Sequence, residues 1–108
     1  MRRVVVSGIG AVTPLGGNIK TTWENLIENK SGANLISKFD TSDFQTKISC
    51  EVPIKDNQNS SENTFDPNKW FSSKDLRKVD DFIIFGVAAA EMALEDSLLK
   101  NHNFDPNK

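Results

Sequence analysis

Three cations, Lys74, Arg77 and Lys78, form the group whose spacing points most directly to a binding role. On a helix, the i, i+3 and i+4 spacing places all three side chains on one face. Cations near the start of a helix oppose its macrodipole and destabilise it slightly, which hints at another purpose. Such a face favours an acidic partner. The alternative is an ordinary solvated face, partly neutralised by neighbouring aspartates.

A thiol nucleophile could come only from Cys50 and its base only from His102, because the sequence has one cysteine and one histidine. A catalytic cysteine needs an adjacent base and a depressed pKa. His102 lies far along the chain in an asparagine-rich tail, so we expect Cys50 to be buried and inert and His102 to be solvated. These counts also exclude a disulfide framework and the usual zinc sites. We expect no catalytic residue, metal or cofactor.

Two other patterns contain some, but not all, of the features that a functional site requires. Asp80 and Asp81 are adjacent carboxylates, but neighbours on a helix point about 100° apart and do not converge on one atom. Ion pairing with the nearby cations would explain them. The glycines at 8 and 10 resemble a dinucleotide-binding turn, yet Thr13 stands where a third glycine belongs. We therefore interpret Gly8 and Gly10 as structural glycines.

The first elements that would position these residues are a strand and a helix. Residues 3–10 predict a buried strand, because consecutive β-branched residues suit a pleated surface covered on both sides. Residues 19–29 predict an amphipathic helix, capped by Asn18 and stopped by Gly32. Its predicted apolar face comprises Ile19, Trp23, Leu26 and Ile27.

The middle of the chain alternates short apolar and polar stretches. We expect residues 33–44 to be an irregular connector and residues 47–52 a short strand closed by Pro53. Residues 54–69 are mostly polar and predict a mobile surface loop.

The longest predicted element is a helix from about Ser73 to Leu99, capped by Ser72 with Asp75 as a weak capping box. It is apolar nearly all round, which is typical of a buried helix. Residues 101–108 are expected to be a loop. The predicted apolar stripe comprises Leu76, Val79, Ile83, Gly86, Val87, Ala90 and Leu94, and it is widened by Phe82, Phe85, Ala89 and Ala93.

Composition limits the possible functions further. A net charge of -2 disfavours a strongly basic nucleic-acid binder. The longest apolar run, residues 82–90, is too short to cross a membrane, and no convincing signal peptide opens the chain, so we expect a cytoplasmic protein. A chain of 108 residues struggles to bury such a helix. The predicted elements therefore indicate the N-terminal part of a larger α/β domain.

Four stretches carry a family resemblance over residues 2–98. Together they resemble the β-ketoacyl-acyl-carrier-protein synthases, and most of all the type II elongating condensing enzymes of bacterial fatty-acid synthesis. The stretches are Arg3-Val-Val-Val-Ser-Gly-Ile-Gly-Ala-Val-Thr-Pro-Leu-Gly, Trp23-Glu-Asn-Leu with Lys30-Ser-Gly, Phe39-Asp-Thr-Ser-Asp-Phe-Gln-Thr-Lys-Ile, and Arg77-Lys-Val-Asp-Asp-Phe-Ile.

The resemblance implies a thiolase-like fold of layered helices and sheets, of which residues 1–108 would be an incomplete N-terminal part. Members of the family move an acyl chain from the carrier protein's phosphopantetheine to a cysteine. Decarboxylation of malonyl-carrier protein then yields a carbanion that attacks the acyl-enzyme, assisted by two histidines and a lysine. These four residues lie beyond position 108 in the family, and Cys50 and His102 match none of them. The resemblance therefore implies a chain that is inactive alone.

The resemblance also assigns a partner to the cationic group. In the family, a basic cluster at this helix start contacts the acidic acyl carrier protein, and Lys74, Arg77 and Lys78 occupy the matching positions. The full-length family is expected to form homodimers, and the rest of the synthase would come in the same chain or from a second one. Two alternatives stay open, a non-catalytic docking module and a functionless remnant of a split gene.

Overall fold

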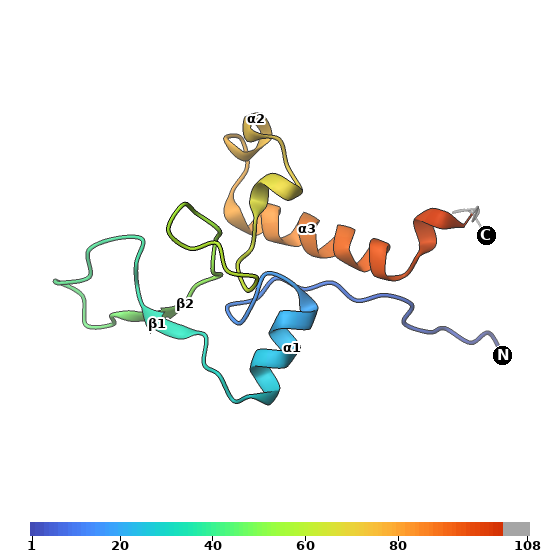
Figure 1. Ribbon diagram of the computed structural model, residues 1–108, viewed down its shortest axis with the longest axis horizontal. Helices are drawn as coiled ribbons and strands as arrows, with labels where there is room; N and C mark the ends of the chain where they lie inside the picture. The colour runs from blue at the N-terminus through green and yellow to red at the C-terminus, as the bar shows by residue number, and fades with distance from the viewer. Residues whose placement is uncertain (103–108) are drawn as a thin grey trace. The chain divides into compact units, whose positions relative to one another are not determined.

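The computed structural model describes residues 1–102 and contains both helices and strands, in agreement with the α/β prediction. Contacts divide the chain into two compact units. The hairpin unit is Val12–Asp66, and the helix unit combines Met1–Ala11 with the residues from Pro67 onward. The loop predicted at the chain's end falls largely on residues 103–108, outside the described residues. The described elements are α1 (Ile19–Ile27), β1 (Ala33–Leu35), β2 (Ile48–Cys50), the 3₁₀ turn η1 (Pro67–Lys69), α2 (Ser73–Leu76), α3 (Asp81–Asp96) and the 3₁₀ turn η2 (Leu99–Asn101) (Figure 1).

Helix α1 begins where the sequence predicts. The Asn18 side chain accepts a hydrogen bond from the Thr21 amide at 2.9 Å, which satisfies an amide that the first turn leaves unpaired. The end of the helix is different, because Asn29 has a φ of 56° and turns the chain three residues before Gly32. The prediction of Gly32 as the stop is therefore wrong. Asparagine tolerates the left-handed conformation better than most residues and takes the glycine's usual place.

The buried face of α1 is polar rather than apolar. Thr21 and Asn25 are buried, and Asn25 Nδ2 donates to the carbonyl oxygen of Leu15 at 2.6 Å. Hydrogen bonds to the preceding loop thus determine which face of α1 turns inward. The predicted apolar face is exposed on this chain, at Ile19, Trp23, Leu26 and Ile27.

Strands β1 and β2 form an antiparallel hairpin. Ala33 lies opposite Cys50 and Leu35 opposite Ile48. The short strand predicted within residues 47–52 is confirmed. The prediction of an irregular connector is wrong for its first three residues, because β2 supplies the partner that lets them form a strand.

Residues 54–69 are not simply a surface loop. Phe65 is only 1% exposed and is the largest fully buried side chain in the described chain. Its amide donates to the Pro53 carbonyl at 2.6 Å, and its carbonyl accepts from the Lys55 amide at 2.8 Å. Gly17 lies so close that an added Cβ would be 2.7 Å from Phe65 Cα. One aromatic residue therefore anchors a stretch whose polar composition predicted exposure.

The helix predicted over residues 73–99 is two helices. Ser72 caps α2 by accepting from the Asp75 amide at 3.2 Å, as predicted. However, α2 ends at Leu76, and Asp80 is extended, with φ −75° and ψ 157°, before α3 begins. Serine and aspartate both favour the residue before a helix, so this stretch contains two helix starts. The prediction missed the second one.

The N-terminal segment, residues 3–10, runs alongside α3 without joining a sheet (Figure 1). The predicted buried strand is therefore wrong for this chain, since Val4, Val5 and Val6 are 95%, 73% and 82% exposed. A strand requires a neighbour to pair with, and the rest of residues 1–102 provides none. The interpretation of its glycines is confirmed. A Cβ at Gly8 would lie 2.6 Å from the Ser97 amide nitrogen, and one at Gly10 would lie 2.7 Å from that of Ala93.

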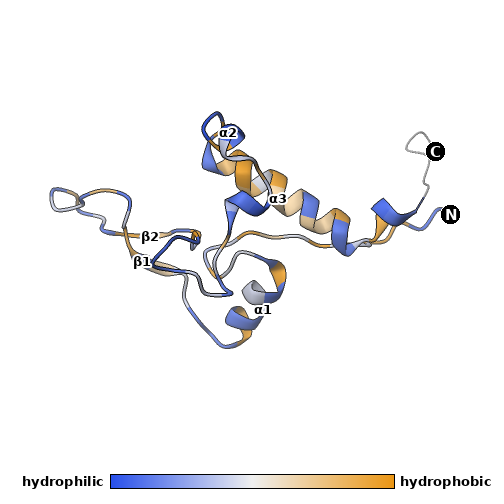
Figure 2. Cartoon of the chain, turned by 45° about the horizontal axis from the view of Figure 1, so that its top comes forward, coloured by the Kyte–Doolittle hydropathy of each residue, from blue (hydrophilic) through white to orange (hydrophobic). Residues whose placement is uncertain are grey.

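Helix α3 is buried along one line only, contrary to the prediction of burial on most sides. Ile84 and Ala88 are 6% and 0% exposed. Hydrophobic residues nevertheless recur along its length (Figure 2). Its outer apolar residues are exposed, namely Phe82, Ile83, Val87 and Leu94. Among the described residues, no helix combines the length and apolar character needed to span a bilayer.

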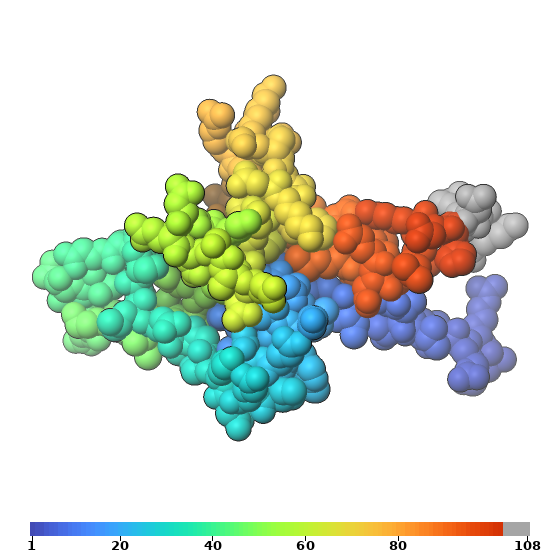
Figure 3. Space-filling view, in the orientation of Figure 1, coloured from blue at the N-terminus to red at the C-terminus, as the bar shows by residue number. Residues whose placement is uncertain are grey.

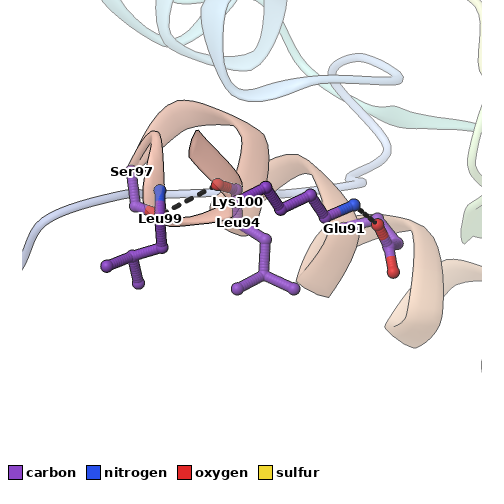
Figure 4. Close-up of polar contacts among 5 residues, drawn as sticks. All are labelled: Glu91, Leu94, Ser97, Leu99 and Lys100. Atoms are coloured by element: carbon purple, nitrogen blue, oxygen red, sulfur yellow. Dashed lines mark hydrogen bonds and ion pairs between the residues drawn. The ribbon is translucent and has the colours of Figure 1, made fainter. Parts of the chain in front are cut away.

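The end of α3 is held by local polar contacts (Figure 4). Ser97 Oγ donates to the Leu94 carbonyl at 2.8 Å and accepts from the Leu99 amide at 3.3 Å. Lys100 reaches back to pair with Glu91, and this hydrogen bond raises the pKa of the lysine. These contacts fix η2 against the last turns of α3.

Candidate functional site

The cationic cluster, Lys74, Arg77 and Lys78, lies on α2 and the turn after it. All three residues are exposed, and this region projects from the helix unit in the space-filling view (Figure 3). The spacing predicted that all three lie on one face of a long helix. They do not, because α2 ends at Leu76. Lys74 is helical, Arg77 is the C-cap residue and Lys78 is in the turn. The three cations are thus close in sequence, but they lie on a bend of the chain rather than on one helix face.

Local hydrogen bonds hold this bend. Ser72 Oγ donates to Asp75 Oδ2 at 2.6 Å, so the one carboxylate within residues 69–78 is engaged with the helix cap. Arg77 Nε donates to the Ser73 carbonyl at 3.3 Å, and the Lys78 amide donates to the Asp75 carbonyl at 2.9 Å. The lysine ammonium groups and the outer edge of the guanidinium face solvent, where they can contact an anionic surface.

One cation that the sequence analysis did not single out lies in the same stretch. Lys69 Nζ is 5.3 Å from the centroid of the Trp70 ring, within the range of a cation–π contact. Residues 69–78 therefore carry four cations and one carboxylate, in a chain whose net charge is -2. The adjacent lysine and tryptophan ahead of Ser72 are the signal that could have identified it.

The two residues considered for thiol chemistry belong to different units, Cys50 to the hairpin unit and His102 to the helix unit. Cys50 ends β2 and is exposed, so the prediction of a buried cysteine is wrong. A three-residue strand in a two-stranded hairpin has too little cover to bury it. His102 is exposed after η2, as expected. Over residues 1–102, no group of three or more histidine, cysteine or acidic side chains is arranged to hold a metal ion.

The adjacent carboxylates mark the start of a helix. Asp80 is the residue before α3 and Asp81 its first residue. Negative side chains are favoured there by the helix macrodipole. The ion pairing predicted for them assumed one continuous helix, whereas α2 and α3 are separate helices.

A hollow of about 450 Å³ in the hairpin unit was not found from the sequence. Ser37 and Glu51 lie on its wall, and Ser37 Oγ donates to Glu51 Oε2 at 2.7 Å. This hydrogen bond holds the pKa of the Glu51 carboxyl below its ordinary value of 4.5. The hollow's lining offers hydrogen bonds but contains neither a cysteine nor a histidine. No periodic pattern joins residues 37 and 51, so only the pairing of β1 with β2 reveals the contact.

The chain matches one family model over its whole length. The model of the β-ketoacyl synthase N-terminal domain matches residues 1–108. The chain therefore belongs to the β-ketoacyl synthase family.

Similar proteins point to a particular branch of that family. The chain is 40% identical over 97 residues to 3-oxoacyl-[acyl-carrier-protein] synthase 2 of Rhizobium meliloti, covering 90% of this chain and 22% of the relative. The proteins of the same name from Coxiella burnetii and Vibrio cholerae are each 39% identical over 99 residues, covering 92% of this chain and 22% of each relative. The chain thus spans about a fifth of the length of these relatives.

Proposed function

We propose that this chain is the N-terminal part of a 3-oxoacyl-acyl-carrier-protein synthase and that Lys74, Arg77 and Lys78 bind the carrier protein. The match of the family's N-terminal domain over residues 1–108 carries the proposal. In the complete enzyme the reaction would be decarboxylative condensation of an acyl thioester with malonyl-carrier protein. The layered thiolase-like fold, the homodimer and the cytoplasmic location belong to the same proposal.

The cationic cluster supports the choice of partner on electrostatic grounds. Its side chains are exposed, and Asp75, the one carboxylate within residues 69–78, accepts a hydrogen bond from Ser72, while Asp80 and Asp81 follow the cluster in sequence. A small positive surface on a chain of net negative charge attracts acidic partners locally and steers their approach. Such steering acts over about 8 Å at physiological salt and weakens as salt is added.

The chain's own residues do not support catalysis without further polypeptide. Cys50 is its one thiol, and it lies exposed at the end of β2, without a match to the family's nucleophile. The nucleophile, both histidines and the lysine would come from the rest of the synthase. We therefore expect the purified chain to release no carbon dioxide from malonyl-carrier protein.

The first prediction tests the docking surface by charge reversal. Acidic acyl carrier protein is titrated into the chain at low salt, and heat release or fluorescence is measured. Arg77→Glu replaces an attraction with a repulsion, which is expected to weaken binding by about tenfold if each exposed pair contributes about 0.5–1 kcal/mol. Binding by the unchanged chain should also fall steeply as salt is raised.

A matched control is available on α1. Lys20 is 83% exposed at its side chain and lies 4.0 Å from Glu24, in the other unit. Lys20→Glu makes the same kind of charge reversal away from the cluster and should leave carrier binding within about twofold. Equal losses for both variants would show only a response to net charge and would refute the assignment to Lys74, Arg77 and Lys78.

A further inference from the structure

Lys69 is a fourth cation in the stretch that leads into the cationic cluster. It ends the 3₁₀ turn η1 and is exposed. Its Nζ lies 5.3 Å from the centroid of the Trp70 ring. A cation–π contact orients an ammonium group but leaves its charge in place, whereas a salt bridge would neutralise it. Lys69 thus combines a defined position with a full positive charge.

The backbone around Trp70 fixes the base of the indole side chain. The amides of Trp70 and Phe71 both donate to the Pro67 carbonyl, at 3.2 and 3.1 Å. Pro67 also begins η1 and restricts its backbone, because proline has a fixed φ. Trp70 itself is half-buried. A half-buried ring on a hydrogen-bonded turn is a rigid support for a lysine whose side chain would otherwise sample many rotamers.

The charge balance of this stretch favours a negatively charged partner. Residues 69–78 contain Lys69 and the three cations of the cluster, and Asp75 is the one carboxylate among them. Asp75 is tied to the cap of α2 by a hydrogen bond of 2.6 Å. Asp80 and Asp81 lie beyond the stretch, at the start of α3. Lys69 therefore extends the positive surface on the side of the cluster away from these aspartates in sequence.

One partner surface is large enough to reach all four cations. The Cα atoms of Lys69 and Lys74 lie at most about 18 Å apart, because five residues can span no more. A typical protein interface covers about 800 Å² on each partner, which corresponds to a width of about 30 Å. A carrier protein bound to the cluster therefore has the size to contact Lys69 as well.

We propose that Lys69 is a fourth contact for the acidic surface of the carrier protein and that Trp70 is its positioning residue. The inference rests on the proposed docking function of the cationic cluster, and it adds two residues that the family resemblance does not assign. The partner group is a carboxylate side chain of the carrier, which would accept a charge-assisted hydrogen bond from the Lys69 ammonium.

The experiment titrates acyl carrier protein into the 108-residue chain at low salt and compares dissociation constants. Lys69→Glu should weaken binding by about three- to tenfold, because it turns an exposed attraction into a repulsion. Lys69→Arg keeps the charge and the stacking on the ring, so binding should stay within about twofold of the unchanged chain. No loss in Lys69→Glu overturns the proposal.

Lys20→Glu is the matched charge control. Lys20 is exposed on α1, in the other unit, so its reversal should change carrier binding by less than about twofold. Equal losses in Lys20→Glu and Lys69→Glu would reflect net charge alone and would also overturn the assignment to Lys69.

A double-mutant cycle tests the role of Trp70. Trp70→Leu removes the ring and should weaken binding by about threefold while Lys69 is present. In a Lys69→Met background, the same substitution should cause no further loss, since no cation remains to be positioned. A merely structural role for the indole would weaken binding equally in both backgrounds and would overturn the positioning role.

Trp70→Phe keeps the test decisive if Trp70→Leu does not fold, which circular dichroism would show. Phenylalanine retains an aromatic face but attracts a cation less strongly than tryptophan. The loss of binding should therefore be smaller than in Trp70→Leu and should also disappear in the Lys69→Met background. The same loss with and without Lys69 would again overturn the positioning role.

The outcomes separate this inference from the proposed docking function. Weaker binding in Arg77→Glu with unchanged binding in Lys69→Glu rejects the roles of Lys69 and Trp70 alone. Weaker binding in Lys69→Glu with unchanged binding in Arg77→Glu rejects the cluster and supports the Lys69 contact. No binding by the unchanged chain overturns both.

Discussion

At the scale of single residues, the contact between Ser37 and Glu51 links the connector to the residue after β2. The serine donates through its hydroxyl at 2.7 Å, and its amide lies 3.4 Å from the other carboxylate oxygen. Both contacts favour the charged carboxylate, so the pKa of Glu51 is lowered, with desolvation as a smaller opposing effect. A carboxyl whose folded pKa is depressed stabilises the fold above its unfolded pKa, and this stabilisation disappears as the pH falls through the lowered pKa.

Ser37→Ala should therefore raise the pKa of Glu51 toward 4.5. The carboxyl carbon of Glu51 would be followed by NMR as the pH is lowered from 7 to 2. Ser42→Ala is a useful comparison, because Ser42 donates to Asp40 at 2.5 Å and should affect only the pKa of Asp40. An unchanged midpoint for Glu51 in Ser37→Ala would mean that the hydrogen bond is not formed in solution.

Predictability differed among residues according to the range of the interactions that place them. The caps Asn18 and Ser72 could be predicted because a cap is decided within three or four residues. The exposure of Cys50 and the burial of Phe65 could not, because each depends on chain segments distant in sequence. Likewise, the cationic cluster was visible as a spacing, but its bend depends on where α3 starts.

At the scale of elements, two glycines have opposite surroundings. A Cβ at Gly10 would collide with the Ala89 carbonyl oxygen and approach Met92 Cβ to 2.9 Å. A Cβ at Gly86 would meet nothing within 4 Å, although Gly86 is inside α3. Gly10 therefore lies at a close backbone contact with α3, whereas Gly86 has open space around it in the described chain.

Substituting each glycine by alanine should therefore change stability in opposite directions. Gly86→Ala should stabilise α3 by about 0.5–1 kcal/mol through helix propensity. Gly10→Ala should destabilise the packing of the N-terminal segment on α3 by about 1–3 kcal/mol through overpacking. Helix content measured by circular dichroism at 222 nm during urea titration would test both. A loss of helix in Gly86→Ala would contradict the open surroundings of that residue.

The elements that could be predicted are those that local patterns suffice to form. Helix α1 and strand β2 were predicted close to their observed positions. Residues 3–10 do not form the strand that was predicted for them, because a strand exists only when a partner is present to share its hydrogen bonds. The division of residues 73–99 was missed because a continuous apolar pattern outweighed the aspartate that starts α3.

At the scale of the whole molecule, burial is sparse in both units. Phe65, Ile84 and Ala88 are the apolar residues that are buried in the described part of the chain, whereas eighteen large apolar side chains are exposed. Each fully buried aliphatic or aromatic side chain contributes about 1.5–3 kcal/mol. Ordering one residue costs about 1–2 kcal/mol in backbone entropy. So few buried residues leave little net stability for 108 residues.

We therefore expect the purified chain to unfold over a broad temperature range and to bind a hydrophobic dye before heating. Differential scanning calorimetry and dye fluorescence would measure these properties. Co-expression with the rest of a synthase should sharpen the transition and reduce dye binding, since the exposed apolar faces would then be covered. A sharp, cooperative transition of the monomer alone would contradict this prediction.

The two tryptophans lie in different units, so their intrinsic fluorescence can report on each unit. Trp23 lies on the exposed face of α1 in the hairpin unit, and Trp70 lies beside Lys69 in the helix unit. With no tyrosine in the sequence, excitation near 295 nm reads these two indoles and nothing else. Trp70→Phe leaves an emission that reports on the solvent at α1, while Trp23→Phe leaves one that reports on the stretch next to the cationic cluster. The emission wavelength of the remaining tryptophan can thus follow each unit without an added label.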